Sequence, residues 1–147
     1  MHDFAEEQIA NPHEWYESGY APIPHYGYPD YPDGQLRSSA QDMAKFLSMF
    51  ANDGSHENVQ ILQPETVAEM KNISIPEQNQ GLIWYQFSLA NIDYMGHGGS
   101  DWGVRTKMGY RISDGTGFLV FLNAQPSSVQ PFKQIQKALI NTADEEP

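Results

Sequence analysis

The residues with the clearest potential for chemistry lie in one short stretch, Gly96-His-Gly-Gly-Ser-Asp101. Its first four residues are three glycines around His97, whose side chain can accept or donate a proton near neutral pH. Glycine inside a strand often marks a place where a ligand or another backbone approaches closely. The stretch therefore predicts either a strand that lines a binding site or a glycine-rich turn around a structural histidine.

Other arrangements of chemically active side chains are poor. Ser100, His97 and Asp101 have the residue types of a hydrolytic triad, but neighbours along one strand point to different faces. His25, His56 and His97 lack the spacing of a zinc site. The doubled Tyr-Pro-Asp within residues 28–33 lacks the ligand spacing of an EF-hand and predicts a turn. We therefore predict no metal and no cofactor.

The element around His97 is predicted to be a strand of an antiparallel meander. Aromatic and β-branched residues favour strands over 81–88, 92–97, 103–112 and 117–123, with a hairpin loop over 113–117. Short connections favour antiparallel pairing. A helix from about Ser128 follows. We expect its apolar stripe to contain Val129, Phe132, Ile135 and Leu139.

Residues 38–80 are predicted to be helical. Ser38 or Ser39 can cap a first helix, which ends near Asn52-Asp-Gly54. A second helix begins around Gln63-Pro64-Glu65 with proline at its first position and ends before Pro76. We expect the first helix to bury Met43, Phe46, Leu47 and Phe50, and the second to bury Val67 and Met70.

Residues 1–37 are predicted to form an extended, turn-rich arm. Five prolines lie between Pro12 and Pro32, and each disfavours helix at its own position and the one before. The arm also holds many aromatic side chains, which indicates that it packs against the rest of the protein. These are Trp15, Tyr16, Tyr20, Tyr26, Tyr28 and Tyr31.

Composition and charge exclude several classes of protein. The chain has 147 residues, which suits a single domain over 1–147, and 39% of them are hydrophobic, too many for a disordered chain. The absence of Cys excludes disulfides, thiolate zinc sites and a thiol nucleophile. A net charge of −11 argues against a nucleic-acid partner. We also expect no membrane span, and the first residues do not have the pattern of a signal peptide.

Several motifs in order resemble the serine β-lactamase and penicillin-binding-protein-like hydrolases, on the class C and DD-peptidase side. Residues 31–47, Ile61–Met70, Gly81-Leu-Ile-Trp84 and Gly96–Met108 each match a segment of that family, as do residues 118–123. The resemblance implies a partial β-lactamase/transpeptidase-like fold of α/β (α+β) type, with a three- to four-stranded antiparallel sheet packed with helices.

The resemblance also assigns roles to the glycine-rich stretch. His97-Gly98-Gly99 falls on the family's third active-site motif, which implies a catalytic electrostatic role for His97 and substrate contacts for Gly98, Gly99 and Ser100. It also implies that the Ser100 backbone N–H is one of the two oxyanion donors. Trp102 stands where the family commonly has proline.

The family's nucleophile motif is absent from this sequence. No serine has Lys three residues later, and no tyrosine has Asn two residues later. We therefore expect a C-terminal segment of a serine hydrolase of the β-lactam or D-Ala-D-Ala peptide or ester class. It would carry the His-Gly-Gly wall and would need an N-terminal half to act on a small-molecule or peptide substrate. The alternatives are a non-catalytic peptide or cell-wall binding module, or a truncated product. The family implies a periplasmic or extracellular location.

The apolar strand expected over 118–123 also predicts an association. It has neither proline nor charge, and an uncovered edge of this kind pairs readily with other strands. The N-terminal arm, a second copy or the missing half could cover it. We favour a homodimer, because the proline-rich arm is a poor strand partner.

Overall fold

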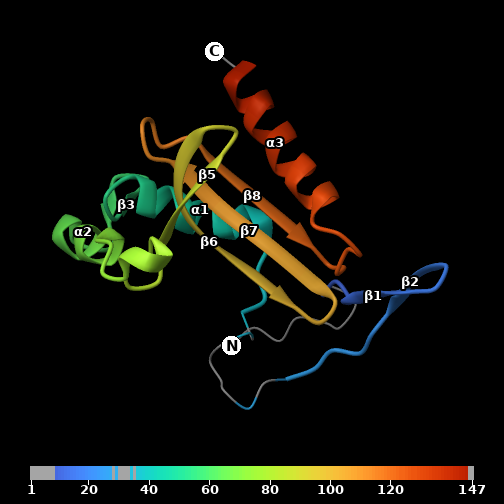
Figure 1. Ribbon diagram of the computed structural model, residues 1–147. Helices are drawn as coiled ribbons and strands as arrows, with labels where there is room; N and C mark the ends of the chain where they lie inside the picture. Colours follow the sequence, from blue (N-terminus) through green and yellow to red (C-terminus); the bar gives the residue numbers. More distant parts are fainter. Residues whose placement is uncertain (1–8, 28, 30–33, 35, 146–147) are drawn as a thin grey trace.

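A four-stranded antiparallel sheet, in the order β5-β6-β7-β8, forms the centre of the protein (Figure 1). The computed structural model describes residues 9–27, 29, 34 and 36–145. Consecutive strands are neighbours, so the predicted α+β architecture with an antiparallel sheet is confirmed. The strands are β5 Tyr85–Leu89, β6 Ile92–Asp101, β7 Val104–Arg111 and β8 Gly117–Leu122.

Helices cover both faces of this sheet (Figure 1). The helices are α1 Ala40–Ala51, α2 Pro64–Lys71 and α3 Gln130–Glu145. One core cluster joins Phe50 of α1 and Val67 of α2 to Met95 of β6. The other joins Phe132 of α3 to Tyr94, the residue before Met95. Because successive side chains of a strand point to opposite faces, α1 and α3 pack on opposite sides of the sheet.

The first helix forms largely as its sequence predicts. Ser39 caps it, and the Ser39 hydroxyl accepts a hydrogen bond from the Asp42 N–H at 3.1 Å. Leu47 and Phe50 are buried as expected, but so is Met49, whereas Phe46 is 36% exposed. The rings of Phe46 and Phe50 both contact Trp84, with centroids 6.1 and 4.2 Å from it. The buried face of α1 is therefore rotated slightly from the predicted one, toward Met49 and away from Phe46.

The predicted apolar stripe of α3 was wrong. Phe132 is buried, but Val129, Ile135 and Leu139 are 38%, 40% and 42% exposed. The residues that face the sheet recur every four positions and are Phe132, Gln136 and Ile140. Apolar residues lie on two neighbouring faces of α3, and the face that also contains Gln136 packs against the sheet.

The glycine-rich stretch is a strand throughout, not a turn. β6 continues through Gly98 and Gly99 to Asp101, four residues past the predicted end, because β7 pairs with it all the way to Asp101↔Val104. Residues 81–84, predicted as strand, precede β5 and bring Trp84 into the core. Three short elements were not predicted: β3 Ser55–His56, β4 Val59–Gln60 and the 3-10 helix η2 Pro76–Gln78.

The N-terminal arm contains a hairpin that the sequence did not predict (Figure 1). β1 His13–Tyr16 pairs with β2 Gly19–Pro22, and Pro22 lies at the outer end of the hairpin, opposite His13. The expectation of an extended, turn-rich arm did not include this pairing, which the prolines allow because Pro12 and Pro22 lie at the open end of the hairpin, away from its turn. The arm packs against the rest of the protein only in part: Ile23 is buried, the His13 N–H donates to the Gly103 carbonyl, and the Tyr26 ring centroid lies 5.6 Å from that of Trp102. Contrary to the expectation, Trp15, Tyr16 and Tyr20 are about half exposed, and Tyr28 and Tyr31 lie outside the described residues.

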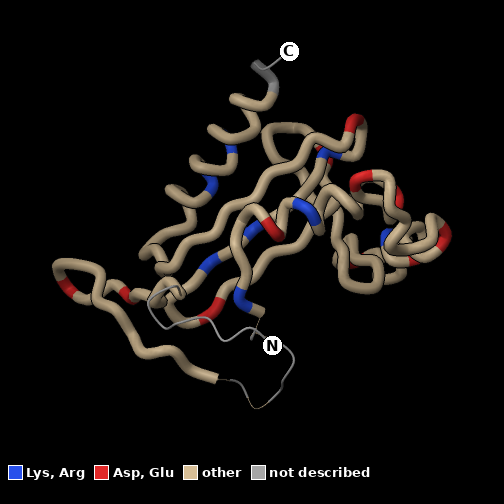
Figure 2. The backbone as a smooth tube through the Cα atoms, turned by 180° about the vertical axis from the view of Figure 1, so that it is seen from behind, with Lys and Arg blue, Asp and Glu red and all other residues tan. Residues whose placement is uncertain are grey.

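Charges are unevenly distributed over the molecule (Figure 2). Acidic residues are frequent in the N-terminal hairpin and around α2, whereas Lys and Arg occur along the sheet and on α3. Within the described part of the chain, no helix combines the length and apolarity that crossing a membrane requires.

Candidate active-site strand

One half of β6 lies at an edge of the sheet. β5 pairs with β6 only as far as Tyr85↔Gly96, whereas β7 continues to Asp101↔Val104. Among the described residues, 97–101 therefore have a strand partner on one side only. This open segment contains all the residues that the sequence analysis singled out, namely His97, Gly98, Gly99 and Ser100.

The hydrogen-bond alternation sets the direction of the Ser100 backbone N–H. The Ile112 N–H donates to the Asp93 carbonyl at 3.1 Å, so Asp93 is a residue whose backbone groups point toward β7. In an antiparallel pair such residues alternate with those whose groups point the other way. The register runs without interruption from Tyr94↔Arg111 to Asp101↔Val104. The N–H groups of Gly98 and Ser100 therefore point to the open edge, away from β7.

Side-chain alternation separates His97 from Ser100. His97 shares a face with Met95, which belongs to the α1 core, whereas Ser100 shares a face with Tyr94. The His97 side chain is exposed, and its ring lies edge-on to Tyr85 with centroids 5.5 Å apart. The side chains of Ser100 and His97 thus do not converge, which argues against a local Ser-His-Asp triad.

The two glycines keep the open strand bare. A Cβ at Gly98 would lie 3.1 Å from both Lys107 Cδ and the Tyr85 hydroxyl oxygen. A Cβ at Gly99 would meet Thr106 Oγ1 at 2.9 Å. Without these methyl groups an extended ligand backbone can approach the strand closely.

The turn after β6 is fixed by the N-terminal arm. Trp102 Nε1 donates to the Glu14 carboxylate at 2.6 Å, and the Tyr26 hydroxyl donates to the Trp102 carbonyl at 2.5 Å. Burial raises the pKa of Tyr26, with a smaller contribution from Asp101, so this hydroxyl stays protonated as a donor. Sequence reasoning identified Trp102 as unusual and Tyr26 as one of the arm's aromatic residues, but it did not connect the two and missed Glu14. The aromatic density of the arm was the signal for this contact.

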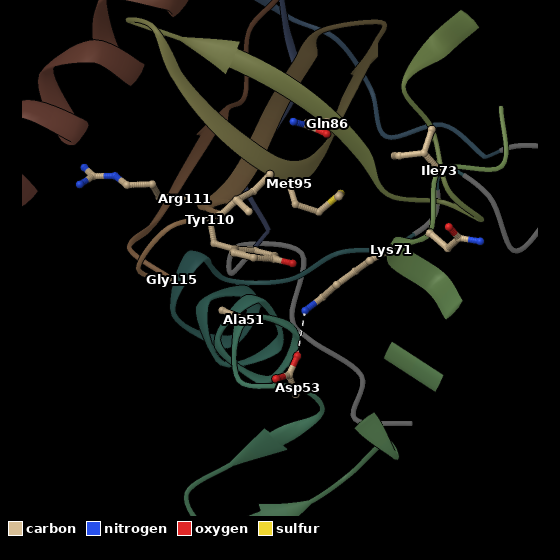
Figure 3. A pocket seen from close by; sticks show the side chains of 11 residues that line it. Ala51, Asp53, Lys71, Ile73, Gln86, Met95, Tyr110, Arg111 and Gly115 are labelled. Carbon is tan, nitrogen blue, oxygen red and sulfur yellow. Dashed lines mark hydrogen bonds and ion pairs between the residues drawn. The ribbon is translucent and has the colours of Figure 1, made fainter. Parts of the chain in front are cut away.

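A cavity of about 610 Å³ lies between the sheet, the end of α1 and the end of α2 (Figure 3). Lys71 Nζ lies 3.2 Å from a carboxylate oxygen of Asp53, and 5.3 Å from the centroid of the Tyr110 ring. Lys71 and Asp53, two of the charged residues that line this cavity, are therefore paired with each other, and Arg111, the third, pairs with Asp114 at 3.0 Å. Across the described residues, no cluster of three or more His, Cys, Asp or Glu side chains could hold a metal ion.

Comparison with known sequences gives one family. The sequence model of the family described as Beta-lactamase matches residues 3–141. No curated protein and no solved structure shows a significant match to the chain. The match spans the arm, the helical segment, the whole sheet and most of α3.

Proposed function

Because the chain belongs to the Beta-lactamase family, we propose that the open half of β6 is one wall of an acyl-transfer site. In this proposal the Ser100 N–H donates to the carbonyl oxygen that becomes the oxyanion. The direction of that N–H, toward the open edge, is the observation that carries the proposal. A preorganised backbone donor of this kind contributes about 3–4 kcal/mol to acyl transfer.

His97 supplies electrostatics beside this wall. Its side chain is exposed on the same strand, one residue before Gly98, and it can carry a positive charge near neutral pH. Gly98 and Gly99 let the substrate backbone lie against the strand, where it can also accept from Gly98. We propose that the substrate is a β-lactam or a D-Ala-D-Ala peptide or ester.

The nucleophile of the proposed site comes from outside this sequence. No serine here has the lysine that activates it one helical turn away. We therefore propose that the chain is not catalytic alone and that a polypeptide with Ser-x-x-Lys and Tyr-x-Asn completes the site. Attack by that serine on the substrate carbonyl would form the acyl-enzyme and release the leaving group, with Ser100 holding the oxyanion.

Acylation by a fluorescent penicillin tests the proposal, with intact mass as the readout. We expect no adduct on the chain alone and a stoichiometric adduct on the complementing polypeptide when the two are mixed. In the mixture Ser100→Pro, which removes the N–H, should slow acylation by about 100-fold or more. Ser100→Ala keeps the N–H and should be nearly neutral, and His97→Ala should slow the reaction. An acyl-serine on the chain alone, or equal rates for Ser100→Pro and Ser100→Ala, would overturn it.

We also propose a homodimer through β8. In the described part of the chain β8 is the last strand of the sheet, and Phe121 on it is 37% exposed. Pairing with a second copy would satisfy this edge. Light scattering over a concentration series should give twice the chain mass. A monomer throughout, with fast amide exchange at Val120 and Leu122, would contradict it.

A further inference from the structure

A second cavity lies on the face of the sheet opposite to His97. It has a volume of about 540 Å³, is open to solvent on one side, and is bordered by β5, the open half of β6, β7 and the start of α3. This volume is within the range of small-molecule sites, roughly 300–1,000 Å³. Its apolar walls are formed by Tyr85, Phe87, Leu89 and Phe132.

The charged residues of this cavity are all basic. Arg105, Lys107 and Lys133 line it, and none of its lining residues is Asp or Glu. The whole chain has only 8 Lys and Arg against 19 Asp and Glu, so three cations around one cavity are a marked local excess. Figure 2 shows the basic positions along the sheet and on α3. The cavity therefore favours an anion although the protein as a whole is acidic.

Lys107 carries its charge into aromatic surroundings. Its Nζ lies 3.6 Å from the centroid of the Phe87 ring and 4.2 Å from that of Tyr85, and it donates to the Tyr85 hydroxyl at 2.6 Å. Burial lowers the pKa of Lys107 to about 8. The ammonium is thus partly desolvated, and none of the residues that line the cavity offers it a carboxylate.

Gln136 brings an amide to the same cavity. Its residue is 6% exposed, and it is one of the residues that line the cavity. An amide can both donate and accept hydrogen bonds. The amide of Gln136 and the ammonium of Lys107, which has no carboxylate among the lining residues, therefore lie in one cavity, where one ligand could contact both.

We propose that this cavity binds a small organic carboxylate with an aromatic or aliphatic body. The carboxylate accepts hydrogen bonds from the Lys107 ammonium, the Gln136 amide and the guanidinium of Arg105. Arg105 is oriented for this by the Phe132 ring, 5.3 Å from its guanidinium carbon. The apolar body lies against Tyr85, Phe87 and Leu89. A carboxylate on an apolar body suits the site better than a phosphate because the walls are apolar.

Calorimetry with 1-naphthoate tests the proposal, with 1-naphthamide as the neutral probe of the same shape. We expect 1-naphthoate to bind and 1-naphthamide to bind at least about tenfold more weakly. Lys107→Met should weaken 1-naphthoate binding by about tenfold or more, and Gln136→Leu by about fivefold. Lys137→Met is the matched control, because Lys137 is an exposed cation of α3 that does not line the cavity. It should change the affinity by less than about twofold.

Each contrary result has a defined meaning. Equal binding of 1-naphthoate and 1-naphthamide would overturn the proposal, because no anion would be recognised. An equal loss in Lys107→Met and Lys137→Met would also overturn it, since diffuse charge would explain the binding. So would the absence of saturable binding up to about 10 mM. Should Lys107→Met fail to fold, Gln136→Leu against Lys137→Met decides the question.

Discussion

Lys71 and Lys107 lie on opposite faces of the same sheet, and each is near an aromatic ring. Lys71 is 5.3 Å from the Tyr110 centroid and has the Asp53 carboxylate at 3.2 Å, as Figure 3 shows. Lys107 is 3.6 Å from the Phe87 centroid and donates a hydrogen bond to the Tyr85 hydroxyl. The first cavity supplies its lysine with a carboxylate, and the second has no carboxylate among its lining residues. Burial of a lysine alone therefore does not indicate a binding site, whereas a buried lysine without a nearby carboxylate does.

The largest expected effect on stability comes from adding a methyl group at a glycine of β6, the strand that separates the two cavities. A Cβ at Gly96 would lie 2.2 Å from the Met108 carbonyl oxygen and 3.0 Å from the Phe87 ring, so backbone must move. We expect Gly96→Ala to lower the free energy of unfolding by about 3 kcal/mol or more. Gly99→Ala is the control, because it meets only the Thr106 hydroxyl, and it should cost about 1 kcal/mol or less. Urea unfolding measures both, and equal losses would contradict the steric argument.

Removing the unmatched charge should stabilise the protein. Lys107→Met keeps the apolar stem and removes the ammonium, so we expect the free energy of unfolding at pH 7 to rise by about 1–2 kcal/mol. The folded pKa of about 8 lies below the usual 10.5, so the unfolded chain binds more protons between these values. Stability of the parent should therefore increase as pH rises above about 8, and the variant should lack this increase.

The pH experiment is best confined to the range below the tyrosine titrations. Burial raises the pKa of Tyr85, which faces Lys107, so Tyr85 stays neutral there. The difference between parent and Lys107→Met thus reports on Lys107. A difference that does not change between pH 7 and 9.5 would refute the assignment.

The smallest effect is expected on the other face. Lys71→Met removes the ion pair with Asp53, whose side chain is 74% exposed, so water already screens the attraction. We expect a loss of about 1 kcal/mol or less, and a further decrease of that loss in high salt. Thermal unfolding at two salt concentrations measures it. A loss larger than the change in Lys107→Met would reverse the proposed contrast between the cavities.

The sequence predicted the sheet and the first two helices because local patterns decide them. Pro64, before Glu65, determines the start of α2. The residues of β7 and β8 favour strands, and the segment between them has the composition of a hairpin loop. The sequence-based prediction failed where two faces of a helix are similarly apolar and packing decides which one is buried. In α3 a glutamine, not Ile135 or Leu139, faces the sheet.

The candidate site was predicted only in part. The glycines around His97 identified the strand, but no pattern in the sequence could show that β5 ends opposite Gly96 and leaves Ser100 at an open edge. Nor could it show that Lys107 reaches Tyr85, because that contact depends on the register of three strands. Long-range pairing decides both features, and local residue types do not encode it.

The anchoring of the β6–β7 turn by the arm has a consequence for how the protein tolerates cleavage. Glu14 and Tyr26 hold Trp102, only two residues from Ser100, so the arm and the wall strand open together or not at all. A protease that cuts the exposed β1–β2 turn would leave Tyr26 in the main chain but would hold Glu14 only through the pairing of β1 with β2, whereas trimming the chain past Tyr26 would remove both anchors. Loss of the N-terminal arm, which is far from β6 in the sequence, would thus increase local fluctuation of the open half of β6.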